Sequence, residues 1–180
     1  MTVATPGVGT SAGASPLLAV PTANLLVAGI GELVVTRDTS LHLVAYGLGS
    51  CVALSAWDPV TKAAALGHFM LPAGVAGPTP GTPVKFVDGG LDHFLDAFKS
   101  IGGRLPRAQL KAAGGASMLS IMVGGLDIGR RNGDAILAGL GAAGLRLHAK
   151  DLGGSAGRTV LLAAADGRLL VKSVSTTSVL

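Results

Sequence analysis

The chain has 180 residues, of which 49% are apolar and only 13% are charged, about half the usual share of charge. With 28 glycines and 9 prolines, it is too rich in helix breakers for a helical bundle and too apolar for a disordered chain. No apolar run of about 18 residues is free of Gly, Pro and polar groups, so we expect no membrane insertion. The length predicts one domain with a short tail.

The net charge of +4 raises the question of a nucleic-acid partner. The basic residues are dispersed along the chain, and aromatic residues make up only 3% of it, which leaves little surface for base stacking. We therefore expect no nucleic-acid partner. A basic surface would instead suit an acidic protein.

Residues 1–24 are predicted to be a flexible Ala/Gly/Pro-rich tail, and 25–180 to be the folded domain. The uncharged start of the chain is interrupted by prolines and lacks the basic opening of a secretory signal. Cys51 is the only cysteine, so no internal disulfide can form. This fits a reducing compartment and predicts a cytoplasmic location.

The predicted elements mix strands with helices, which indicates an α+β fold. In chain order, strands are expected over 33–36, 41–46, 51–57, 63–70, 145–150, 159–165 and 169–174. A helix is expected after Asp88, where apolar residues recur with helical spacing until Gly102. A second helix is expected from Asn132, as its N-cap, to Gly144.

One turn predicts a pairing of a thiol with an imidazole. Asp58-Pro59-Val60-Thr61 has the residues of a four-residue hairpin loop. If Trp57 then pairs with Lys62, the register places Cys51 directly opposite His68. The Cβ atoms of such a pair lie about 5 Å apart on one face of the sheet.

That contact would give Cys51 the surroundings of a nucleophile. A free thiol has a pKa of about 8.5, and a neighbouring imidazole can take its proton. Backbone N–H groups around Gly49 and Ser50 could bind the oxyanion of a tetrahedral intermediate. The same residues also fit a buried structural cysteine beside a hydrogen-bonded histidine, because free cysteine is among the most buried residue types.

The remaining residues give no pattern for a cofactor or a metal. His42, His93 and His148 are each expected at the surface. One cysteine gives no zinc-ligand spacing. The sequence Gly47-Leu48-Gly49 lacks the third glycine of a dinucleotide-binding turn, so no cofactor is expected.

Six ordered motifs resemble the chemoreceptor glutamine deamidases of the CheD family. They are Leu48–Val52, Asp58-Pro59, His68–Pro72, Gly114–Ser117, Ile128–Asn132 and Asp151–Arg158. The resemblance extends from about Gly29 to Val174. It implies a single domain of packed mixed or antiparallel β-sheets with helices on the outside, similar to a deamidating bacterial toxin with papain-like chemistry.

The resemblance also implies an activity, in which Cys51 is the nucleophile and His68 the general base. The reaction would hydrolyse selected glutamine side chains of methyl-accepting chemotaxis receptors to glutamate, release ammonia and need no cofactor. Members of the family also bind a CheC-type phosphatase.

One position departs from the family, because its third catalytic residue, a threonine, is replaced here by Ala45. A methyl group cannot orient an imidazole by hydrogen bonding. A backbone carbonyl, a water or a hydroxyl such as that of Tyr46 could take over this role. The alternative is a binding module that docks on receptors or on the phosphatase with little or no catalysis.

Overall fold

A computed structural model describes residues 20–74, 81–117 and 127–180. Most of the predicted tail, residues 1–19, lies outside this part of the chain. Within it, a short 3-10 helix at Thr22–Asn24 precedes the first strand. No helix among the described residues is long and apolar enough to cross a membrane.

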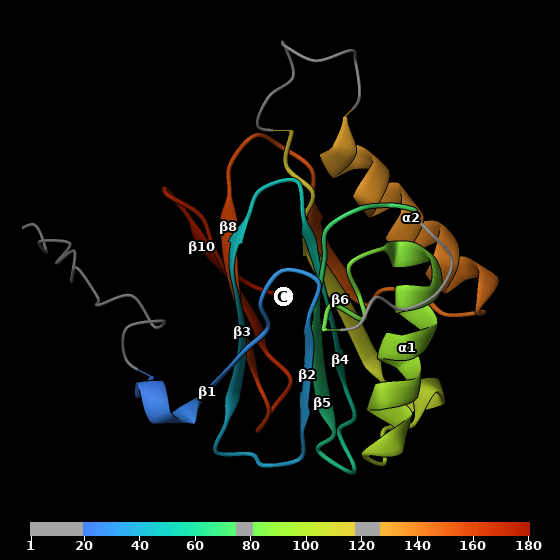
Figure 1. Ribbon diagram of the computed structural model, residues 1–180. Coiled ribbons are helices and arrows are strands. Elements are labelled where there is room, and N and C mark those ends of the chain that lie inside the picture. Colours follow the sequence, from blue (N-terminus) through green and yellow to red (C-terminus); the bar gives the residue numbers. More distant parts are fainter. Residues whose placement is uncertain (1–19, 75–80, 118–126) are drawn as a thin grey trace, which may run out of the picture.

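Ten strands form two five-stranded sheets (Figure 1). The first sheet has the order β1 (Leu25–Val27), β3 (His42–Leu48), β8 (Arg158–Ala163), β9 (Leu169–Lys172), β10 (Thr177–Val179). The second has the order β2 (Leu33–Thr36), β5 (Ala64–Phe69), β4 (Val52–Trp57), β6 (Gln109–Gly114), β7 (Ala149–Leu152). Two pairs, β1 with β3 and β6 with β7, are parallel, and the others are antiparallel.

Two helices, α1 (Val87–Ser100) and α2 (Ile128–Ala142), cover the outer face of the second sheet (Figure 1). This arrangement confirms the α+β class, with packed sheets and outer helices. Because side chains alternate along a strand, β4 and β5 contribute to two cores. One lies between this sheet and the helices, and the other lies between the two sheets.

The structure corrects several predicted boundaries. The second helix begins at Ile128, and its N-cap is Asp127, whose carboxylate accepts from the Arg130 N–H. Asn132 is therefore not the N-cap but a buried residue of the second helical turn. The alternating segment 145–150 forms a strand only from Ala149 onward. Three strands, β1, β6 and β10, were not predicted.

The predicted register of the β4–β5 hairpin is wrong by two residues. Trp57 pairs with Ala64 rather than Lys62. The loop is longer because Lys62 adopts a left-handed conformation with φ 59°. Consequently Ala53, not Cys51, lies opposite His68. A shift of two residues leaves every side chain on its original face, so the two candidate residues still share a side of the sheet.

The carboxylate of Asp58 organises this loop from a fully buried position. It accepts hydrogen bonds from the N–H groups of Val60, Thr61 and Arg104, and it pairs with the Arg107 guanidinium at 2.8 Å. Burial raises the pKa of Asp58, but the Arg107 contact and the three N–H donors outweigh it and hold the pKa well below its ordinary value.

Replacing Asp58 with Ala is expected to lower the free energy of unfolding at neutral pH by about 3 kcal/mol, because several donors lose their acceptor. The folded-state pKa is depressed, so the contribution is complete above the unfolded-state pKa of about 3.9 and is lost as pH falls toward the folded value. Urea unfolding at neutral pH and near pH 3 measures it. The difference between wild type and Asp58→Ala should shrink in acid.

Asp96→Ala is the matched control, since Asp96 is an exposed helix carboxylate paired with Lys99. Its effect should stay below about 1 kcal/mol at either pH. An Asp58→Ala difference that is the same at both pH values would contradict the assignment of the depressed pKa.

Candidate active site

His68 lies on β5, and its side chain faces the space between the two sheets, where it is 1% exposed. Its Nδ1 lies 3.3 Å from the carbonyl oxygen of Ala28. A carbonyl can only accept, so this contact requires the proton on Nδ1. Nε2 is buried and has no hydrogen-bond partner in the described part of the chain. The ring therefore keeps a basic lone pair on Nε2.

The chain between β1 and β2 is fixed against β5 by main-chain hydrogen bonds. The Ala28 N–H donates to Val44 on β3 at 2.8 Å. On the other side of the segment, the His68 N–H donates to the carbonyl of Glu32 at 2.9 Å, and the Gly31 N–H donates to the carbonyl of His68 at 2.8 Å. These bonds hold the Ala28 carbonyl in place beside the imidazole.

The surroundings of His68 favour its neutral form. Burial lowers the pKa of His68, while the Ala28 carbonyl and the negative charge of Glu32 act in the opposite direction. Burial is the largest of these effects, so the pKa lies below the ordinary value. A neutral imidazole at physiological pH can act as a base.

Cys51 lies immediately before β4, and its thiol is partly exposed. The segment that carries it is held by the end of β6, since the Gly115 N–H donates to the Cys51 carbonyl at 2.7 Å and the Ala116 N–H donates to Gly49 at 2.8 Å. Gly114 is required here. Its φ is 118°, and a Cβ at this position would overlap the Cys51 carbonyl oxygen.

The N–H groups before the thiol differ in their availability. The Gly49 N–H donates to the carbonyl of Gly47 at 2.9 Å and is occupied within the turn. Apart from the sulfur of Cys51 itself, no group of the described residues accepts from the N–H of Ser50 or Cys51. The Cys51 N–H is close enough to its own sulfur to favour the thiolate. Free donors of this kind can bind an oxyanion.

Cys51 and His68 face the same inter-sheet space, but no hydrogen bond joins the thiol to either ring nitrogen. Cys51 packs against the core between the sheets, and His68 follows Ala64 and Leu66 on the same side of β5. Cys51 is two residues from Ala53, the residue opposite His68. Such diagonal neighbours lie about 7–8 Å apart. Burial raises the pKa of the Cys51 thiol, and its own N–H only partly opposes this.

The group that contacts the His68 imidazole is a backbone carbonyl, that of Ala28, and not the side chain at position 45. Ala45 lies on β3 opposite Val160 and is fully buried between the sheets. Its methyl group cannot hydrogen-bond the imidazole. Tyr46 is 49% exposed and is not a partner of either His68 nitrogen. Of the three substitutes considered, the structure contains the backbone carbonyl.

The other histidines stand apart from this pair. His93 is exposed on α1. The Nδ1 of His148 accepts from the Leu110 N–H at 3.2 Å, and the Nδ1 of His42 is buried without a partner in the described part of the chain. Within that part, no three His, Cys, Asp or Glu side chains gather as metal ligands would.

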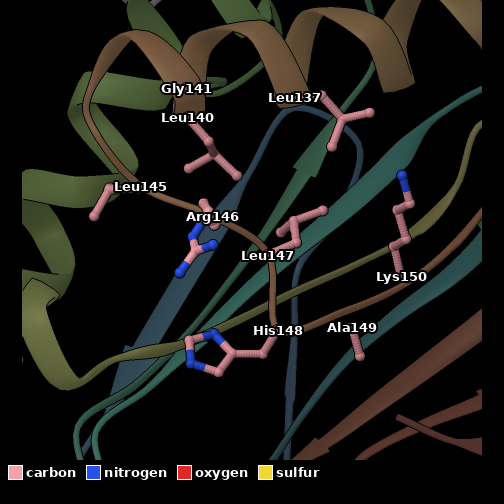
Figure 2. A pocket seen from close by; sticks show the side chains of 9 residues that line it. All are labelled: Leu137, Leu140, Gly141, Leu145, Arg146, Leu147, His148, Ala149 and Lys150. Atoms are coloured by element: carbon pink, nitrogen blue, oxygen red, sulfur yellow. The ribbon is translucent and has the colours of Figure 1, made fainter.

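Two hollows lie along α2, away from the candidate pair. One of about 390 Å³ lies between the C-terminal half of α2 and the segment 145–150 (Figure 2). The other, of about 510 Å³, lies between the N-terminal half of α2 and β7. Neither is lined by Cys51 or His68.

Comparison with known proteins decides the family. The family described as CheD chemotactic sensory transduction matches residues 70–173, more than half of the chain. The chain belongs to the CheD family. The matched range begins two residues after His68 and contains the Gly114–Ser117 and Ile128–Asn132 motifs.

Individual relatives of the CheD family cover more of the chain. A protein of Symbiobacterium thermophilum named probable chemoreceptor glutamine deamidase CheD is 42% identical over 149 residues, which is 81% of this chain and 90% of the relative. The chemoreceptor glutamine deamidase CheD of Thermotoga maritima is 38% identical over 82% of this chain and 91% of its own length. An archaeal relative from Archaeoglobus fulgidus, also named as a probable deamidase, is 37% identical over 82% of this chain and 92% of its own length.

The raised pKa of Cys51 gives a test of the resting site. Iodoacetamide alkylation of Cys51, followed by mass spectrometry from about pH 6 to pH 10, is expected to accelerate with a midpoint above the free-thiol value of about 8.5. Alkylation of glutathione under the same conditions is the control. A midpoint below about 7.5 would instead demonstrate a preformed thiolate–imidazolium pair.

Proposed function

We propose that this protein hydrolyses glutamine side chains of methyl-accepting chemotaxis receptors to glutamate. The observation that carries the proposal is the state of His68, a buried neutral imidazole with a free Nε2 on the same face as the single, partly exposed thiol. Membership of the CheD family and the names of the relatives supply the reaction and the substrate.

In the proposed reaction, Nε2 of His68 takes the thiol proton as the Cys51 sulfur attacks the carboxamide carbon of the substrate. The carbonyl oxygen becomes an oxyanion, and the N–H groups of Ser50 and Cys51 stabilise it. The C–N bond then breaks, and the imidazolium gives its proton to the nitrogen, which leaves as ammonia. Water, activated by the same Nε2, hydrolyses the thioester to glutamate and restores the thiol.

The Ala28 carbonyl would act through His68. A bond from Nδ1–H to this carbonyl fixes the tautomer that presents a lone pair at Nε2. When Nε2 is protonated, the same carbonyl and the charge of Glu32 stabilise the cation. The main chain thus supports the imidazole where the family's threonine is replaced by Ala45.

The position of the pair suits a side chain presented by another protein. Cys51 is at the end of a strand, outside the two hollows along α2, so a glutamine projecting from a folded surface can reach it. Such a substrate places the enzyme in the cytoplasm with the signalling region of the receptors. The proposed chemistry uses no cofactor, and a CheC-type phosphatase is a second proposed partner.

A receptor cytoplasmic fragment incubated with this protein is expected to gain glutamate at particular glutamines, with ammonia in equal amount. Cys51→Ala and His68→Ala should each lower the rate by at least about 10³-fold, and the double variant should be no slower, because the two residues act as one unit. Peptide mass spectrometry and an ammonia assay read the reaction.

His93→Ala is the matched control, because His93 is exposed on α1 and should leave the rate unchanged. Equal background deamidation by wild type and Cys51→Ala, with receptor binding retained in both, would replace the enzyme by a docking module.

Ala45→Thr tests whether the imidazole lacks an orienting group. If a hydroxyl were merely missing, the rate constant would rise with little change in the Michaelis constant. Because the Ala28 carbonyl already contacts Nδ1 and Ala45 is fully buried, kcat is expected to stay equal or fall. Ala45→Val is the control, because valine has nearly the same shape as threonine but no hydroxyl. It separates the effect of crowding from that of hydrogen bonding. An increase in kcat for Ala45→Thr alone would contradict the role of Ala28.

A further inference from the structure

Asn132 lies on α2 and is completely buried. Its Nδ2 donates two hydrogen bonds of 2.8 Å, one to the carbonyl of Ser50 and one to the carbonyl of Met70. Both hydrogens of the amide nitrogen are therefore used. The two carbonyls belong to different chain segments, one leading into β4 and the other leaving β5.

These two carbonyls flank the point where the sheet stops. The last pair of the β4–β5 ladder is Val52 with Phe69. The next pair in the same register would be Cys51 with Met70. Neither residue belongs to a strand, and the Asn132 amide bridges the two chains at this level. Ser50 thereby keeps, among the described residues, a free N–H that the next hydrogen-bonded pair of a continued ladder, Ser50 with Leu71, would use.

Packing alone does not account for an amide at this position. The Oδ1 of Asn132 is buried without a hydrogen-bond partner in the described part of the chain, which is costly. An apolar side chain would avoid that cost, but it would leave the carbonyls of Ser50 and Met70 without these donors. The helix also approaches closely, because Gly129 lies where a Cβ would come within 2.5 Å of the carbonyl oxygens of Gly115 and Ala116.

We propose that Asn132 is a positioning residue for the reaction proposed above, on which this inference rests. Through Ser50 and Met70 it ends the ladder at Val52 and Phe69. It thus sets the position of the Cys51 sulfur relative to Nε2 of His68, and it keeps the Ser50 N–H free for the oxyanion. It acts from the helix side of the sheet and does not touch the substrate.

The test uses Asn132→Leu, which keeps the branching at Cγ in a larger side chain but removes both donors, and Asn132→Ala in case the larger side chain does not fit. Steady-state deamidation of a receptor fragment should show kcat lowered about 100-fold, the effect of a reacting group misplaced by about 1 Å, with KM within about twofold of wild type. Iodoacetamide alkylation of Cys51 should become about tenfold faster, because a loosened segment exposes the thiol and relieves the burial that raises its pKa.

Ser55→Ala is the matched control, since Ser55 is a buried β4 residue that donates to the Lys111 carbonyl. It should leave kcat and alkylation unchanged. Thermal unfolding sets the assay temperature well below the midpoint of every variant. The opposite signs of the two changes, slower catalysis and faster alkylation, distinguish positioning from a general loss of folded protein.

A folded Asn132→Leu or Asn132→Ala with wild-type kcat and alkylation would overturn the proposal. Failure of both variants to fold would also overturn it, by assigning Asn132 a purely structural role. If wild type itself releases no ammonia, the proposed function fails. The alkylation rates of the Asn132 and Ser55 variants then decide by themselves whether Asn132 positions the thiol.

Discussion

The β4–β5 ladder ends at Val52 and Phe69, and the candidate site depends on that end. His68 lies inside the ladder, so its backbone is fixed by both neighbouring chains. Cys51 lies one residue beyond it, where its carbonyl accepts from the Gly115 N–H and its own N–H donates to no other described residue. In the proposed reaction, this pair of strands thus supplies a fixed base and a thiol that lies beyond the ladder.

Burial favours the uncharged form of both Cys51 and His68. It raises the pKa of the thiol and lowers the pKa of the imidazole, so the uncharged forms are favoured. Charge separation then belongs to the reaction rather than to the resting protein. Because only the thiolate reacts readily with electrophiles and oxidants, a resting thiol of this kind is protected until a substrate brings the proton transfer within reach.

Features with a local signal were predictable from the sequence, whereas those set by distant contacts were not. The helical spacing after Asp88 and the Asp166-Gly167 turn identified α1 and the β8–β9 hairpin. Asp58-Pro59 located the turn, but the left-handed Lys62 lengthened it. The shift was even, so Cys51 and His68 kept a common face. Strand β6, Gln109–Gly114, has few β-branched residues and is a strand because β4 and β7 flank it.

The site also contained partners that side-chain patterns cannot reveal. Asn132 has the residue type of an N-cap, yet Asp127, five residues earlier, caps the helix and leaves Asn132 inside it. The acceptor for His68 is a peptide carbonyl, and any residue at position 28 carries one. Such a contribution follows from the path of the chain rather than from residue identity.

This reliance on the main chain determines where the sequence is free to drift. The site uses main-chain groups of Ala28, Ser50 and Cys51. The same carbonyl and N–H groups would be present with many other side chains, provided that the path of the backbone is unchanged. Gly114 is different, because its positive φ and its contact with the Cys51 carbonyl exclude a side chain. An alanine scan would therefore not detect the acceptor and donors of the site, because they belong to the main chain. Replacing Gly114 with a larger residue would disturb them together.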